Sequence, residues 1–420
     1  MREESRMLVV PANAEDISVE KVMGRLSSGS MIRICATEKI QKYGADVMKL
    51  SVEINRRIYD VVLSLTDVDI PDFFRTEHFF SDLDFQKIDQ MKYALAVEME
   101  YKDEFLSTYH DQLRIINCMV PDKLAVIDIP SEKILSGKWV RLAAQSEVPP
   151  SPKYLFTVQG ISGEGDEVWL HSHGLKRCGL SELEIVGSTK ETCSSHYSVI
   201  ETMAFRMIEN EIDPPLYEPV FLAWLTERVA MVTTLIDWRE AHNYYPDTEL
   251  GKAEDRDDYH SEGTSVILIY PGPDDAEAKK PAPLQLLDRY LGINTLLMIS
   301  SEETERMRRL AQERIIYVRD AAANKDPDVH ILLKIGIKVD KEFLTPDDPD
   351  QREHIWFELK SIKNTIFNKE VFECMLTQDA YYAKNMRTGS TGKYSVEDIT
   401  DWMIIRDGRR YTPDDAYMIN

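Results

Sequence analysis

The first part of the chain carries short apolar runs and alternating segments, a pattern typical of β-strands. Residues 7–10 (MLVV) form an apolar run that ends at Pro11, and residues 47–65 alternate apolar and polar along much of their length. Alternation places every second side chain on one face, so these segments predict half-buried strands. Asp16 or Ser18 is the expected N-cap of a helix that runs to about Leu26. Strands with an intervening helix are the opening of an α+β fold.

Longer periodic segments follow. Apolar residues recur at helical spacing over residues 79–95 and 102–118, which predicts two amphipathic helices. Residues 155–173 hold two apolar segments around a glycine-rich turn and predict a β-hairpin. Residues 194–208 predict a further helix. We therefore expect an N-terminal α+β domain over residues 1–213, a sandwich of sheet and helices.

Residues 216–330 differ in character and predict a middle α/β region. Residues 249–262 are dense in Asp and Glu and predict an exposed loop, whereas residues 265–270 (SVILIY) predict a buried strand. Ser301 is a good N-cap followed by acidic residues in the first turn, where the helix dipole favours them. A long helix is expected over residues 301–323.

Residues 331–420 predict a β-rich C-terminal module. Short alternating segments at roughly ten-residue spacing are typical of a small curled sheet or an open barrel. The segments are residues 330–339, 354–359, 371–376 and 399–405. The fold class expected for the whole chain is α+β, with the N-terminal sheet-and-helix sandwich region and this small module.

The chain is acidic, with 73 Asp and Glu against 50 Lys and Arg and a net charge of −23. Nucleic acids and anionic membranes are negatively charged, so binding to either is disfavoured, and a basic protein is the partner that the charge favours. The five cysteines form no Cys-x-x-Cys pair, and their odd number suits neither a disulfide framework nor a zinc ribbon. Because we find neither a signal peptide nor an apolar stretch of ~20 residues, we expect a cytoplasmic protein.

Two segments of the C-terminal module carry a family resemblance. Residues 353–358 (EHIWFE) and 396–404 (VEDITDWMI), with Gly408 after them, resemble the YegJ-like module, a bacterial domain of unknown function (2314). The resemblance extends over residues 334–415. One departure is residues 389–392 (GSTG), which hold Ser and Thr where the family pattern has an acidic Gly-Asp pair, so no acidic role is expected there.

A second resemblance lies upstream. Residues 169–175 (WLHSHGL) and 179–185 (GLSELEI) are similar to the large N-terminal region of unknown function (4026 type) in multi-domain proteins that carry this module. The two resemblances imply architecture and a bacterial origin. They imply no activity.

The predicted hairpin carries the strongest candidate for chemistry. His171 and His173 lie at i and i+2 of a strand, so both imidazoles point to one face and can share a metal ion. Glu182 and Glu184 have the same relation on the next predicted strand and can supply oxygen ligands or a general base. A divalent metal is the only cofactor that these residues suggest. The alternative is a polar sheet face without a ligand.

The C-terminal module offers a second candidate, a face for a ligand or partner. His354, Trp356 and Glu358 alternate along one strand, with Asp401 and Trp402 on another. A tryptophan beside an acid can bind a cationic or peptidic ligand. Packing of a small sheet explains the tryptophans equally well.

Cys178 is a third candidate. It follows Lys176 and Arg177, which can lower the pKa of its thiol, and it lies near His171 and His173 in the sequence. Such a cysteine is a nucleophile only with a base at hand.

The function expected from these features is non-catalytic. The sequence has no P-loop, no dinucleotide-binding glycine motif, no Gly-x-Ser-x-Gly and no His-Glu-x-x-His. An immunity-like or scaffold protein that holds a basic partner is the first hypothesis. A metal-assisted hydrolase that uses the His/Glu site is the alternative.

Overall fold

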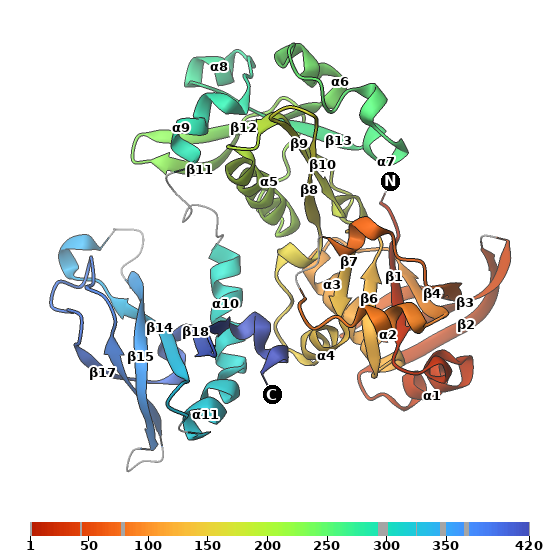
Figure 1. Ribbon diagram of the computed structural model, residues 1–420, viewed down its shortest axis with the longest axis horizontal. Coiled ribbons are helices and arrows are strands. Elements are labelled where there is room, and N and C mark those ends of the chain that lie inside the picture. The colour runs from red at the N-terminus through yellow and green to blue at the C-terminus, as the bar shows by residue number, and fades with distance from the viewer. Residues whose placement is uncertain are drawn as a thin grey trace. The chain divides into compact units, whose positions relative to one another are not determined.

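The computed structural model describes residues 2–42, 44–76, 80–292, 301–324, 326–344, 350–364 and 369–419. It divides into two units, residues 1–145 with 149–300 and residues 146–148 with 301–420. Both units combine helices with sheets, which confirms the predicted α+β class (Figure 1). None of the three sheets formed by these residues closes into a barrel. None of the described helices is long and apolar enough to cross a membrane.

The first sheet of the larger unit has seven antiparallel strands in the order β2-β3-β4-β5-β1-β6-β7. The strands and helix predicted near the N-terminus are confirmed. Of the two expected N-caps, Ser18 rather than Asp16 caps α1, and it accepts a hydrogen bond from the backbone N–H of Lys21. The elements are β1 (Ser5–Pro11), α1 (Val19–Ser28), β2 (Ile32–Lys42), β3 (Ala45–Ile54), β4 (Arg57–Asp67), α2 (Phe85–Gln90), β5 (Tyr93–Met99), α3 (Phe105–Met119), β6 (Lys123–Asp128), β7 (Lys133–Ser136) and α4 (Gly137–Gln145).

The helix predicted over residues 79–95 is wrong for most of its length. Phe79 lies outside the described residues, only α2 is helical, and β5 is a strand between β4 and β1. Residues 94–97 of β5 are at most 4% exposed. A strand buried on both faces shows no alternation, so its pattern does not distinguish it from a buried helix.

The second sheet of this unit has the order β11-β12-β13-β10-β9-β8, with β10 and β13 parallel and the other pairs antiparallel. The predicted hairpin, helix and buried strand are confirmed. The hairpin β11–β12 was not predicted, and it joins the same sheet as strands from before residue 213. The boundary at residue 213 stays a prediction. The elements are β8 (Thr157–Ser162), β9 (Glu167–His173), β10 (Glu182–Thr189), α5 (Cys193–Ile208), β11 (Val220–Thr226), β12 (Val229–Asp237) and β13 (Thr264–Ile269).

The C-terminal unit has six antiparallel strands in the order β17-β16-β15-β14-β18-β19, with α10 and α11 against one face. The long helix predicted over residues 301–323 is present as two consecutive helices. The elements are α10 (Ser301–Glu313), α11 (Ile315–Asn324), β14 (His330–Lys338), β15 (Arg352–Asn364), β16 (Glu370–Leu376), β17 (Thr391–Tyr394), β18 (Ile399–Arg406) and β19 (Arg409–Tyr411).

Candidate metal centre

His171 and His173 lie on β9, where alternate positions place both rings on one face of the sheet. β9 pairs with β10, and His171 stands directly opposite Glu184. Both histidines are buried, at 2% and 5% exposure. The sequence predicted this pair of neighbouring strands correctly.

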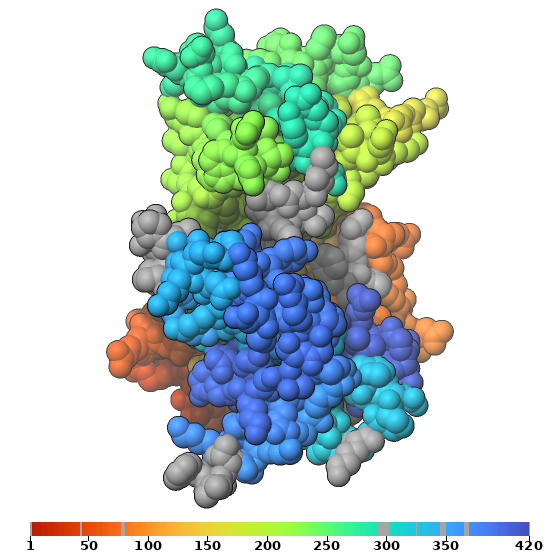
Figure 2. Space-filling model, turned by 90° about the vertical axis from the view of Figure 1, so that its left-hand side faces the viewer, coloured from red at the N-terminus to blue at the C-terminus, as the bar shows by residue number. Residues whose placement is uncertain are grey.

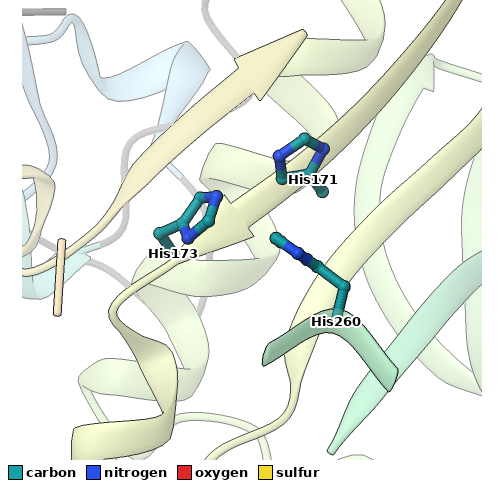
Figure 3. Close-up of side chains that lie close together, drawn as sticks. All are labelled: His171, His173 and His260. Atoms are coloured by element: carbon teal, nitrogen blue, oxygen red, sulfur yellow. The ribbon is translucent and has the colours of Figure 1, made fainter. Parts of the chain in front are cut away.

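A third histidine completes the group. The connection between β12 and β13, residues 238–263, contains the short helix α7 (Asp258–Ser261), which carries His260. Figure 3 shows His260 directed toward the space beside His171 and His173. Its ring centroid lies 4.5 Å from that of His171 and 4.7 Å from that of His173. Each histidine offers one ring nitrogen, and these nitrogens lie within 4.8 Å of one another.

The three rings hold nitrogens that are buried without a hydrogen-bond partner among the described residues. They are His171 Nδ1, His173 Nε2 and His260 Nε2. Leaving one such group buried and unsatisfied costs about 1–3 kcal/mol, and native structures rarely do so. A shared metal ion satisfies several ring nitrogens at once, because neutral imidazole nitrogens are common metal ligands.

A carboxylate binds the outer nitrogen of His260, and a second carboxylate lies near the outer nitrogen of His173. Asp257 Oδ1 lies 2.8 Å from His260 Nδ1, and Glu132 Oε1 lies 3.4 Å from His173 Nδ1. Gln159 donates to the other oxygen of Glu132 at 2.6 Å. A carboxylate on the outer nitrogen fixes the tautomer that directs the inner nitrogen at a metal.

The electrostatic environment keeps the three rings neutral. Burial lowers the pKa of each imidazole below its ordinary value, and the neighbouring histidines lower the pKa of His171 and His173 further. The pKa of His173 is lowered to about 3. For His260 the hydrogen bond to Asp257 opposes the effect of burial without cancelling it. Neutral imidazole is the form that binds metal ions, so no proton has to be displaced near neutral pH.

Glu182 is buried beside the histidines but is engaged elsewhere. Its carboxylate accepts hydrogen bonds from the Ser172 hydroxyl at 2.6 Å, the Tyr259 hydroxyl at 2.6 Å and the backbone N–H groups of Gly174 and Lys176. Tyr259 belongs to the 238–263 connection. Glu182 therefore holds that connection against β9 and β10.

Glu184 has a comparable role. Arg256 donates to both of its oxygens at 2.7 Å and 2.6 Å, and Trp169 Nε1 donates at 3.2 Å. The Arg256 guanidinium also lies over the rings of Trp238 and Trp169. Both glutamates therefore lie outside the histidine group. They bind Arg256 and Tyr259 of the connection that carries His260.

The sequence did not reveal His260. It lies 87 residues beyond His173 in the acid-rich segment 249–262, for which an exposed loop was predicted. That prediction is wrong at its end, because His260 is only 5% exposed. The sequence offered one signal for a buried histidine at this position. His260 follows Tyr259, an aromatic residue, in a segment that is otherwise mostly acidic.

Cys178 is not an activated thiol. Burial raises its pKa to about 12, although Arg177 acts in the opposite direction. Arg177 itself forms a fully buried pair with Asp128 at 2.7 Å. The prediction that neighbouring basic residues lower the pKa of Cys178 is wrong, since desolvation outweighs them.

The residues predicted as a ligand face in the C-terminal unit separate into two groups. Trp356 and Asp401 both stand opposite Lys334, on the two sides of β14, and the Lys334 ammonium lies 5.7 Å from the centre of the Trp356 ring. Trp402 is fully buried on the other face, where its Nε1 donates to the carbonyl of Ala311 at 3.1 Å.

The remaining two residues of this face have local partners. His354 Nδ1 lies 3.0 Å from the Thr400 hydroxyl, and Glu358 pairs with Lys360 at 2.5 Å. Burial raises the pKa of Asp401 to about 6. The structure therefore brings four of the five predicted residues to one face, with Trp402 in the core.

Comparison with known proteins gives three matches, all to families without an assigned activity. Residues 5–150 match the N-terminal and residues 157–268 the C-terminal part of a protein of unknown function, DUF4026. Residues 317–418 match an uncharacterized protein conserved in bacteria, DUF2314. Both predicted resemblances are confirmed. No curated protein and no solved structure matches the chain.

Proposed function

For a chain that carries the two DUF4026 domains followed by a DUF2314 domain, we propose a function as a metal-binding protein centred on His171, His173 and His260. The observation that carries this proposal is the group of three buried ring nitrogens that have no hydrogen-bond partner within the described part of the chain. The carboxylates of Asp257 and Glu132 support it, because the outer ring nitrogen of a metal-bound histidine usually faces a carboxylate or a carbonyl oxygen.

Zinc is the ion that this donor set fits best. Imidazole suits Zn²⁺, Cu²⁺, Ni²⁺ and Fe²⁺, whereas Ca²⁺ and Mg²⁺ prefer oxygen ligands. Both nearby glutamates already have hydrogen-bond partners, so the inner ligands are nitrogen only. Three protein ligands leave the fourth tetrahedral position of zinc to water or a substrate.

A site with three histidine ligands also supports a second candidate function, a metal-assisted hydrolase, because it leaves one position on the metal open. A zinc ion with an open position lowers the pKa of its bound water and makes a nucleophile near neutral pH. Metal binding without turnover instead fits the non-catalytic role expected from the sequence. Hydrolysis of an activated ester, measured with and without stoichiometric zinc, separates the two.

A partner-binding role has support of a different kind. Tyr381 and Tyr382 are 78% and 50% exposed, and their backbone N–H groups both donate to Glu353 at 2.8 Å. A fixed loop that presents aromatic side chains is typical of interaction surfaces. The acidic charge favours a basic partner. Added salt should weaken the capture of that partner, and so should the Tyr381→Ala/Tyr382→Ala double variant.

The test of the metal proposal is calorimetric titration of the full, metal-stripped chain with zinc chloride. We expect one ion per chain, and loss of that binding in His260→Ala. His330→Ala is the matched control, because His330 is exposed and lies in the C-terminal unit. Absence of saturable binding in the unaltered chain contradicts the proposal, as does unchanged binding in a folded His260→Ala variant.

A further inference from the structure

A groove of about 640 Å³ opens on the second sheet, away from the residues of the histidine group. The hairpin β11–β12 forms one wall, and the short helices over residues 284–287 and 288–291 form the other. Figure 2 shows the light-green hairpin beside the teal segment near residue 285 at the surface. Small-molecule sites typically enclose about 300–1,000 Å³, so the groove has room for a ligand of that size.

Aromatic side chains line the groove. Trp224 is 52% exposed although it lies on a strand, and Tyr290 lines the same groove. Tyr270 forms part of the floor and is fixed by its hydroxyl, which donates to the carbonyl of Tyr217 at 2.8 Å. A half-exposed indole on a sheet offers a flat face on which another ring can stack.

Two cations lie at the same groove. Arg228 and Arg289 are exposed, and neither forms an ion pair with a residue that the structure describes. The Arg289 guanidinium lies 4.5 Å from the centre of the Tyr290 ring. Asp288, the acid nearest to Arg289 in the sequence, is engaged with His196 Nε2 at 2.9 Å. In a chain of net charge −23, two neighbouring guanidinium groups that pair with none of the described acids indicate an anion-binding surface.

The wall that carries Arg289 is held in place. The Gln285 amide donates to the carbonyls of Val186 and Gly187 at 3.0 Å and 2.8 Å, and Ala282 forms a bridge with Ile269 of β13. Together with the Asp288–His196 contact, these bonds tie the wall to β10, α5 and β13. A preorganised wall lowers the ordering cost of binding.

We propose that this groove binds a nucleoside phosphate, with the base on Trp224 and the phosphate between Arg228 and Arg289. Guanidinium groups match phosphate oxygens in bidentate geometry, and two of them balance a phosphate dianion. Stacking on an indole suits any base. The overall negative charge disfavours a polynucleotide, so the ligand is a single nucleotide.

Calorimetric titration of the full chain with adenosine monophosphate tests this, with a chelator present so that the metal centre does not contribute. We expect saturable binding that weakens at least about tenfold in Trp224→Ala and in the Arg228→Gln/Arg289→Gln double variant. Arg409→Gln, which changes another exposed arginine, should leave the affinity unchanged.

Two further titrations separate the contributions. Adenosine alone and inorganic phosphate alone should each bind at least about tenfold more weakly than adenosine monophosphate, since each uses only one part of the groove. The proposal is overturned if adenosine monophosphate does not bind, if phosphate alone binds as tightly, or if the folded groove variants keep full affinity. All substituted side chains are exposed, so folding should not be affected.

Discussion

Strands β9 and β15 both carry a histidine in a row of polar residues at alternate positions, yet the two faces differ in what covers them. The 238–263 connection covers β9 and forms hydrogen bonds with Glu182 and Glu184, and it leaves three ring nitrogens without a partner among the residues that the structure describes. On β15, His354 and Glu358 have local hydrogen-bond or ion-pair partners, and Trp356 lies beside Lys334. Alternate spacing therefore places residues on one face, but a segment distant in the sequence decides whether they form a site.

Removal of Arg256 should have the largest effect. Arg256 and Glu184 form an ion pair whose side chains are both 0% exposed. In Arg256→Ala the Glu184 charge stays buried and uncompensated, which should lower the free energy of unfolding by about 3–5 kcal/mol. Urea denaturation measures this.

The matched control for Arg256→Ala is Lys87→Ala, which breaks an exposed ion pair with Asp84. Its effect should stay within about 1 kcal/mol. Equal effects of the two substitutions would show that the 238–263 connection is not held by its buried pair.

Zinc should stabilise the folded chain by the next largest amount. An ion that binds only the folded state, at about 100 times its dissociation constant, raises the free energy of unfolding by about 2.7 kcal/mol. Denaturation with and without zinc measures the difference, and a chelator should reverse it. A shift of the same size in His260→Ala would assign the zinc effect to some other part of the chain.

Loss of the Asp257 carboxylate should reduce zinc affinity less than loss of a histidine ligand. Asp257→Asn weakens the acceptor at His260 Nδ1 and should reduce zinc affinity about 10–100-fold. Asp258→Asn, at the exposed neighbouring position, should leave the affinity unchanged. If both variants bind zinc as the unaltered chain does, Asp257 does not orient the ring.

The smallest effect is expected on the β15 face. Trp356→Ala removes a cation–π contact with Lys334 and should cost about 0.5–1 kcal/mol of stability. Zinc affinity should not change. A loss of about 3 kcal/mol or more would instead be typical of a core tryptophan, as expected for Trp402.

The local pattern of apolar and polar residues was sufficient to predict strands that have one buried and one exposed face. The alternation over residues 47–65 predicted β3 and β4, and i, i+2 spacing predicted that His171 and His173 share a face. Pattern failed for β5, because a strand buried on both faces has no polar positions to mark its period. The hairpin β11–β12 was missed as well.

Only two of the three histidines of the candidate site could be predicted from the sequence, because the third lies far away along the chain. His171 and His173 are close in sequence, whereas His260 reaches them through bonds that Arg256 and Tyr259 make with β10. Glu182 and Glu184 had the right position for ligands, but whether a carboxylate is available depends on its partners. The partners from the 238–263 connection, Arg256 and Tyr259, lie more than 70 residues away from the glutamates and leave no periodic signal.

The most direct test of the account is X-ray absorption spectroscopy at the zinc edge on the full chain loaded with one equivalent of zinc. The account predicts a first shell that includes three imidazole nitrogens at about 2.0–2.1 Å, reduced in His260→Ala. A shell made of oxygen or sulfur ligands, or one that is identical in the variant, would contradict a metal centre at His171, His173 and His260.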